Sequence, residues 1–320
     1  MKVGLFTVLF QQLPFEEALD KVKEYGLEAV EIGTGNYPGS DHCNPDELLQ
    51  DKTKRDKFLR AVEDRGLTIS ALSCQGNPLH PNKEFARRNH ETWQKTVELA
   101  SELEIPVVCH FSGCPGDSLK AENPNWVTCA WPNEYGEVLK WQWEEVAIPY
   151  WQKEAEFARQ KGIKIALEMH PGFLVYNPST LLKLREAAGD NIGANFDPSH
   201  LIWQGIDPAE AIRYLGQTIY HFHAKDTYLD QTNIAKKGVL DTASYAKLSE
   251  RSWTFRSVGY GLDEKAWRNI ITALRLVGYD YVLSIEHEDP LASVEEGLKK
   301  AADFLQNITL KESPAAAWWI

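Results

Sequence analysis

The sequence lacks the features that mark membrane-spanning and secreted proteins. No apolar run is long enough to cross a bilayer, and Met1 to Phe10 show no charged n-region followed by a cleavage site. The five cysteines are an odd set without a CxxC pair, which argues against a disulfide framework and against a structural zinc site. We therefore expect a cytoplasmic protein with reduced thiols.

Positive charge is scarce. The chain has 34 Lys and Arg residues against 46 Asp and Glu residues, and its formal net charge is -12. Such a field repels the phosphates of nucleic acids and the anionic surfaces of membranes, so neither is expected as a partner. Hydrophobic residues make up 43% of the 320 residues, which is ordinary for a globular protein with a large core.

Short apolar runs alternate eight times with longer segments of helical periodicity. This alternation is typical of a parallel α/β fold, and eight units without a strand left over favour a closed (β/α)8 TIM barrel. We expect one barrel domain over residues 1–308. The expected strands lie near Val3–Phe10, Ala29–Gly33, Leu67–Cys74, Pro106–Ser112, Lys164–His170, Gly193–Pro198, Ile219–Lys225 and Tyr281–His287.

Two connections are longer than usual βα loops, namely residues 114–142 after the fourth strand and residues 227–262 after the seventh. They contain Trp126, Trp131 and Trp253, among other aromatic residues. These rings could stack on a sugar above the barrel mouth, or could close a small hydrophobic core under each loop. The sequence leaves both interpretations open.

The last segment, residues 309–320, is an apolar tail. Exposed apolar surface of this kind tends to be covered. The tail is therefore expected to dock on its own barrel or on a second copy of the chain, which makes a homo-oligomer an open alternative.

Ionisable residues stand at the expected C-terminal ends of four successive strands, where the active site of such a barrel lies. They are Glu168, Asp197, His223 and Glu286. Neighbouring carboxylates repel one another unless a cation compensates, and three carboxylates with one imidazole suit a hard or borderline divalent ion. We expect one such ion, Mn²⁺ before Mg²⁺, Co²⁺ or Zn²⁺. His221 shares a strand face with His223, but His223 is nearer the strand end.

This ordered set resembles the sugar isomerase and epimerase group of the xylose-isomerase-like TIM barrels, also known as sugar phosphate isomerases/epimerases. The resemblance extends to about Leu305. It includes a His three residues after the Asp of the sixth strand, which here is His200.

The resemblance also implies roles for individual residues. Glu168 and Glu286, besides holding the metal, would act as the acid/base pair on opposite faces of a bound ketose. His200 and Arg256 would bind the substrate. Further candidates for substrate contacts stand at other expected strand ends, namely Glu31, His110 and His170.

Proton removal beside a carbonyl produces an enediolate, which a divalent metal stabilises. Return of the proton to the other face epimerises the carbon, and return to the adjacent carbon isomerises the sugar. Loss of a leaving group from the next carbon would instead give a dehydratase or a lyase that cleaves a keto-glycoside. We therefore expect a metal-dependent isomerase or epimerase of a ketose or keto-sugar, with the lyase as the alternative.

Two other functions fit less well. A DNA repair endonuclease of the same scaffold would need further metal ligands, whereas the third strand ends in Ser73-Cys74-Gln75 and the late segment reads Phe255-Arg256-Ser257-Val258. A non-catalytic sugar-binding subunit would have no use for two potential bases around a metal. Because a Gly-rich phosphate loop is missing, an unphosphorylated carbohydrate is the expected substrate.

Overall fold

Eight short, almost wholly buried strands pair in parallel and close into a barrel. The computed structural model describes residues 1–313, 315, 317 and 319. Around the barrel the strand order is β1-β10-β7-β6-β5-β4-β3-β2, which confirms the predicted (β/α)8 fold. The strands are β1 (Lys2–Phe6), β2 (Ala29–Gly33), β3 (Thr68–Ser73), β4 (Val107–Phe111), β5 (Lys164–Glu168), β6 (Ile192–Phe196), β7 (Ile219–Ala224) and β10 (Val282–Ile285).

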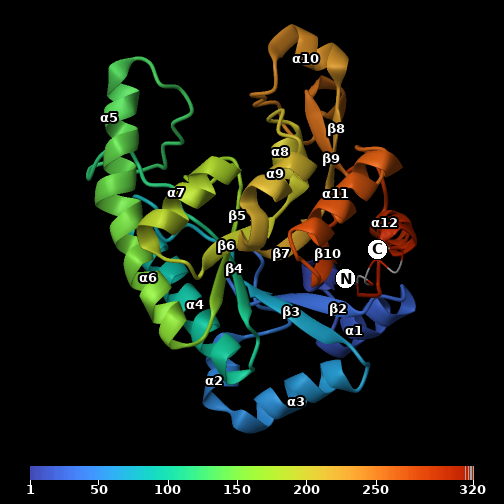
Figure 1. Ribbon diagram of the computed structural model, residues 1–320. Coiled ribbons are helices and arrows are strands. Elements are labelled where there is room, and N and C mark those ends of the chain that lie inside the picture. The colour runs from blue at the N-terminus through green and yellow to red at the C-terminus, as the bar shows by residue number, and fades with distance from the viewer. Residues whose placement is uncertain (314, 316, 318, 320) are drawn as a thin grey trace.

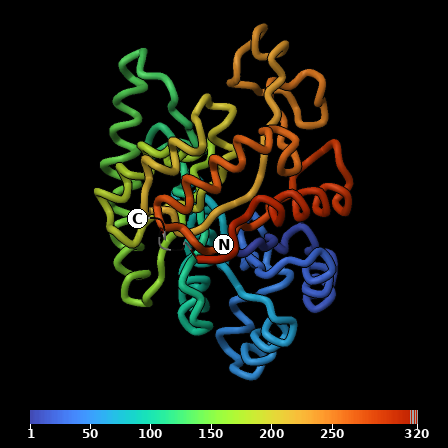
Figure 2. The backbone as a smooth tube through the Cα atoms, turned by 45° about the vertical axis from the view of Figure 1, so that its right-hand side comes forward, coloured from blue at the N-terminus to red at the C-terminus, as the bar shows by residue number. Residues whose placement is uncertain are grey.

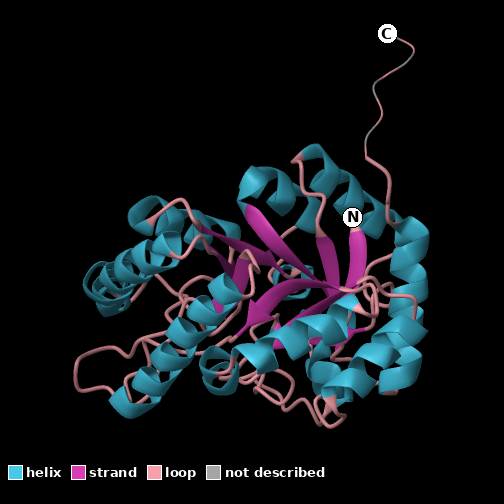
Figure 3. Ribbon diagram, turned by 90° about the horizontal axis from the view of Figure 1, so that it is seen from below, coloured by secondary structure: helices cyan, strands magenta, loops and turns pink. Residues whose placement is uncertain are grey.

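Helices surround the strands, as Figure 3 shows from below. Each main helix turns an apolar face toward the barrel, and Trp93, Trp151 and Trp267 are completely buried there. The main helices are α1 (Phe15–Glu24), α3 (Lys52–Glu63), α4 (Lys83–Glu102), α6 (Ile148–Gln160), α7 (Pro178–Ala188), α9 (Pro208–Leu215), α11 (Glu264–Leu276) and α12 (Val294–Ile308), and the short ones are α2 (Pro45–Gln50) and α8 (Pro198–Ile202).

The first predicted strand is too long. The chain leaves β1 after Phe6 and forms a 3-10 turn over Thr7–Phe10. Apolar residues continue through this turn, and Phe10 is buried, so apolar character alone could not locate the end of the strand.

The predicted loop over residues 114–142 is wrong in its last third. Pro132 precedes a helix, α5 (Asn133–Trp141), which continues through a π-helical turn at Gln142–Ala147 into α6. The helix forms because the residues after Pro132 include helix formers such as Glu, Leu and Lys.

The predicted loop over residues 227–262 contains regular structure as well. An antiparallel hairpin of β8 (Asp226–Leu229) and β9 (Trp253–Arg256) encloses α10 (Gln231–Lys237). In Figures 1 and 2, the green segment around α5 and the orange segment around α10 project from the same side of the molecule. The two long excursions therefore stand above one face of the barrel.

The N-terminus and residue 310 lie together. The amino group of Met1 donates to Asp280 Oδ1 at 2.6 Å and to the carbonyl oxygen of Leu310 at 3.0 Å. Part of the predicted apolar tail, at residues 314, 316, 318 and 320, lies outside the described residues, so its docking site stays a prediction. Among the described helices, none combines the length and apolarity that crossing a membrane requires.

Candidate metal and sugar site

Four predicted ligands meet at the C-terminal mouth of the barrel. Glu168 ends β5, Asp197 follows β6, His223 lies near the end of β7, and Glu286 follows β10. His223 of β7 pairs with Ser284 of β10. Glu286 comes two residues after Ser284, so its side chain lies on the same side of the chain as that of Ser284. One ligand atom from each of the four residues lies within 4.8 Å of the others, as a metal site requires.

Lys225 also belongs to this cluster, and the sequence interpretation missed it. Its side chain is 2% exposed, and Nζ lies 2.8 Å from Glu286 Oε2, 3.1 Å from Asp197 Oδ2 and 3.1 Å from Glu288 Oε2. A signal was present, since His223 and Lys225 are two residues apart at the end of β7 and face the same way.

Three carboxyls at the barrel mouth, Glu168, Asp197 and Glu286, face the ammonium of Lys225 and the imidazole of His223. Burial, reinforced by Glu286 and Asp197, raises the pKa of Glu168 to about 8. Burial acts in the same direction on Glu286, but Lys225 and His223 outweigh it and hold the pKa of that carboxyl below its usual range. Loss of the protons of Glu168 and His223 would leave negative charge that a divalent cation balances, so the donor set fits the predicted ion.

His223 connects the cluster to the barrel interior. Its Nε2 atom lies 2.9 Å from both carboxylate oxygens of Glu31, which also accepts hydrogen bonds from Ser73 and Ser284. Its Nδ1 atom lies 3.0 Å from Glu286 Oε2 and, among the described residues, makes no hydrogen bond of acceptable geometry. This buried nitrogen lies beside the carboxylates of Glu168 and Glu286, and once deprotonated it is a suitable metal ligand.

Glu31 lies one layer below the cavity. It is fully buried, so the predicted contact with a substrate hydroxyl is not what the structure places it to make. Glu31, His221 and His223 also satisfy the spacing of a metal site. That lower set is already hydrogen-bonded, since His221 contacts Asn195 Oδ1 at 3.0 Å and Ser70 Oγ at 3.1 Å.

Two predicted substrate-binding histidines do lie at the mouth. His200 Nε2 is 3.2 Å from Glu168 Oε1 and 3.2 Å from Asp197 Oδ2, and the ring of His170 is 4.1 Å from that of His200. Asp197 is held by its second oxygen, Oδ1, which caps α8 by accepting from the backbone N–H of Ser199. His170 Nδ1 is 2.6 Å from the carbonyl oxygen of Pro171.

Two other predicted residues are not brought to the mouth. His110 belongs to β4, but its side chain points away from the barrel interior and is fully buried edge-on to Trp93 and Trp151. Arg256 donates through Nε to both oxygens of Asp289, at 3.0 and 3.1 Å, and its guanidinium lies over the ring of Tyr260. Neither residue lines the cavities described next.

Two cavities adjoin at this face. One of about 220 Å³ is lined by Phe111, Glu168, Lys225 and Glu286 among others. The other, of about 410 Å³, is lined by Trp126, Trp203, Tyr245, Trp253 and Phe255 among others. His170 lines both cavities, so they are neighbours. The first contains the candidate ligands and is the candidate active site.

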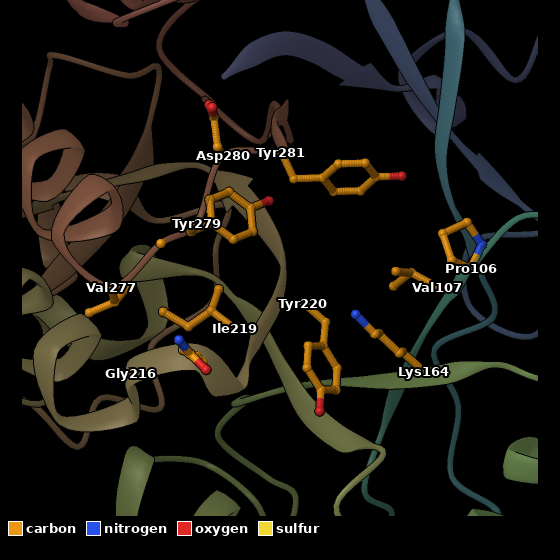
Figure 4. A pocket seen from close by; sticks show the side chains of 12 residues that line it. Pro106, Val107, Lys164, Gly216, Ile219, Tyr220, Val277, Tyr279, Asp280 and Tyr281 are labelled. Atoms are coloured by element: carbon orange, nitrogen blue, oxygen red, sulfur yellow. The ribbon is translucent and has the colours of Figure 1, made fainter. Parts of the chain in front are cut away.

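A third cavity, of about 420 Å³, lies at the opposite end of the barrel. Figure 4 shows Lys164, Tyr220 and Tyr281 around it, near the beginnings of β5, β7 and β10. Asp280 is the one carboxylate among the described residues that line it, and it pairs with the amino group of Met1. A lone, partnered carboxylate does not make a metal or acid/base site.

Known proteins resemble this chain over nearly its whole length. It is 39% identical over 309 residues to the uncharacterized protein YfiH of Bacillus subtilis strain 168, and this match covers 96% of this chain and 98% of that protein. It is 26% identical over 167 residues to an inosose dehydratase of Clostridium tetani strain Massachusetts / E88, which covers 52% and 54% of the two chains.

The fold recurs among solved structures. A D-tagatose 3-epimerase-like protein superposes with a TM-score of 0.64 and 22% identity, and the match covers 96% of this chain and 98% of the other. Residues 19–308 match the xylose isomerase-like TIM barrel family, which is most of the chain. The chain therefore belongs to the family of xylose isomerase-like TIM barrels.

Proposed function

We propose that this protein is a divalent-metal-dependent isomerase or epimerase of a ketose or keto-sugar. The observation that carries the proposal is the meeting of Glu168, Asp197, His223 and Glu286 beside a cavity of about 220 Å³. The resemblance to sugar epimerases and to inosose dehydratase supports a carbohydrate as the substrate.

The four clustered residues would hold the ion. Mn²⁺ suits three carboxylates and an imidazole, with Mg²⁺, Co²⁺ and Zn²⁺ as alternatives. When bound, the ion supplies positive charge that favours ionisation next to a carbonyl group.

Glu168 and Glu286 are proposed as the acid/base pair. Both line the smaller cavity, and β5 and β10, which present them, are separated by β6 and β7 in the barrel, so the carboxyls approach the cavity from two sides. Their surroundings move the two pKa values in opposite directions, and a pair with one ionised and one protonated member can exchange a proton with a substrate carbon.

Neighbouring residues would orient the sugar. Lys225 lines the cavity and can donate to an oxygen on which negative charge develops. His170 lines the same cavity. His200 does not line it, but its Nε2 atom lies 3.2 Å from Glu168 Oε1. Return of the proton to the opposite face of the same carbon gives an epimer, and return to the next carbon gives an isomer.

A dehydratase or keto-glycoside lyase is the second candidate. It would use the same proton removal and then expel water or an alcohol from the neighbouring carbon. The adjoining cavity of about 410 Å³ favours it, because that space could receive a leaving group. A non-catalytic sugar-binding subunit remains the third and weakest candidate, since two carboxyls with opposed pKa values have no role in simple binding.

Solvent-hydrogen exchange tests the proposal. The protein is stripped with a chelator, Mn²⁺, Mg²⁺, Co²⁺ or Zn²⁺ is restored singly, and deuterium entry into a panel of ketoses and 3-keto-glycosides is followed. We expect exchange that needs both the metal and Glu286, with Glu286→Gln inactive and the exposed Glu295→Gln unchanged. Release of water or an alcohol without product isomerisation would favour the lyase, and metal-independent exchange would refute both.

A further inference from the structure

The second cavity at the barrel mouth has aromatic walls. Its volume is about 410 Å³, and the two long excursions supply its rings. Trp126 comes from the connection between β4 and α5, whereas Tyr245, Trp253 and Phe255 come from the segment that includes β9. Trp203, just after α8, completes the set. Both excursions therefore contribute to one binding space.

The aromatic walls are held in place before any ligand binds. The rings of Trp203 and Trp253 stack at 4.9 Å with an interplanar angle of 3°. The buried guanidinium of Arg251 lies 3.9 Å from the centre of the Tyr245 ring and donates to the carbonyl oxygen of Trp253. A preformed wall binds a rigid ligand without a large ordering cost.

Apolar surface predominates in this cavity, although Thr128, Thr242, His170 and His200 also line it, and its carboxylate is already hydrogen-bonded. Among the described residues that line it, Asp241 is the one acid, and it accepts from the backbone N–H groups of Ala243 and Ser252. A second sugar ring would need several free polar side chains for its hydroxyls, whereas a flat aromatic ring needs apolar faces. The lining fits the aromatic ring.

The cavity continues into the candidate active site. His170 lines both cavities, and His200, which lines the aromatic one, has its Nε2 atom 3.2 Å from Glu168 Oε1. The smaller cavity, about 220 Å³, is below the roughly 300–1,000 Å³ of pockets for larger ligands and suits a single sugar ring. A ligand with two rings would fill both spaces.

We propose that the aromatic cavity is a subsite for an aromatic aglycone, so that the substrate is an aryl keto-glycoside whose keto-sugar ring lies beside Glu168 and Glu286. The position of the sugar ring in this proposal rests on the proposed function. The binding of an aromatic ring rests on the lining of the larger cavity alone.

Binding measurements test the subsite independently of turnover. Binding of 2-naphthol to the metal-loaded protein is followed by calorimetry, and the affinities of phenyl and methyl 3-keto-β-D-glucopyranoside are compared. We expect one naphthol site and a tighter phenyl than methyl glycoside. Tyr245→Ala and Trp126→Ala should each weaken naphthol binding about three- to tenfold, the range that one aromatic contact contributes.

The controls separate the possible failures. Tyr245 is 54% exposed, so its truncation should leave the fold intact, and Tyr228→Ala removes a ring of similar exposure, 46%, on the same hairpin but outside the cavity. Absence of saturable naphthol binding, equal loss in Tyr228→Ala, or preference for a disaccharide over the phenyl glycoside would overturn the subsite. Naphthol binding without metal-dependent exchange in any sugar would refute the proposed function and leave the subsite standing.

Discussion

The Nε2 atom of His223 lies 2.9 Å from each carboxylate oxygen of Glu31, beneath the candidate metal site. This contact keeps a proton on Nε2 and turns Nδ1 toward Glu168 and Glu286; the charges of Glu31 and Glu286 outweigh burial and raise the pKa of His223, so a metal bound at Nδ1 would displace a proton. Partners of this kind fix the orientation and basicity of a ligating histidine.

Glu31→Gln should therefore lower the affinity for Mn²⁺ by about 10- to 100-fold, the usual effect of losing such a partner. Calorimetric titration of the metal-free protein with Mn²⁺ measures it. Glu24→Gln, at a side chain that is 65% exposed, is the matched control. Unchanged Mn²⁺ affinity in a folded Glu31→Gln protein would show that Glu31 has no positioning role.

The pKa of Glu168 predicts how the stability of the metal-free protein depends on pH. Burial raises this pKa from 4.5 to about 8, so the folded state keeps a proton that the unfolded state loses. The stabilising contribution is complete below pH 4.5 and is lost as the pH rises toward 8. Glu286, with its lowered pKa, acts below pH 4.5 and does not interfere in this window.

Below about pH 6.5 the buried histidines with lowered pKa, such as His170 and His200, make stability rise with pH, so urea unfolding in chelator between pH 7 and 8.5 measures the effect of Glu168. The free energy of unfolding should fall with rising pH, and Glu168→Gln should flatten the decrease. The exposed Glu295→Gln should retain it. An identical slope in Glu168→Gln would assign the pH dependence to other groups.

Lys225→Met should destabilise the metal-free protein, because the carboxylates of Asp197 and Glu286 lose their buried ammonium partner. Removal of one member of a buried ion pair commonly costs about 3–5 kcal/mol. Bound Mn²⁺ should restore part of this loss by supplying positive charge. Thermal unfolding with and without Mn²⁺ compares the variant with Lys265→Met, a change at an exposed lysine. Equal destabilisation with and without the ion would contradict this balance of charge.

The strand-end ligands could be predicted because parallel strands bring their C-terminal ends to one face. The position of His110 could not, because both faces of a barrel strand are buried and apolar periodicity does not distinguish them. Val107 and Cys109 pack with Ala71 and Ala166 in one cluster, so His110, the residue after Cys109, faces the helices instead. Arg256 was misplaced for another reason, since its partner Asp289 is 33 residues away in the sequence.

Asp226 provides a test of what holds the long segment after β7, residues 227–262, in position. Its buried carboxylate accepts from the backbone N–H groups of Thr227, Gly259, Gly261 and Leu262 and from the indole N–H of Trp267. Every partner of this carboxylate is an N–H donor. In the Asp226→Asn variant, one carboxylate oxygen is replaced by an NH₂ group, which cannot accept from these donors, so some of them would be left unpaired. Because hydrogen bonds to a charged group contribute about 1.5–3 kcal/mol, the free energy of unfolding should fall by about 3 kcal/mol.

Urea unfolding of Asp226→Asn measures this loss, with the exposed Asp64→Asn as the control. Because Asp226 joins the start of the β8–β9 hairpin to Gly259 and Leu262, where the excursion ends, amide hydrogen exchange should increase in β8 and β9 more than in β5. The same loosening should weaken 2-naphthol binding, since Trp253 and Phe255 lie on β9. A variant as stable as the parent, with unchanged exchange in the hairpin, would show that the aromatic packing alone positions the excursion.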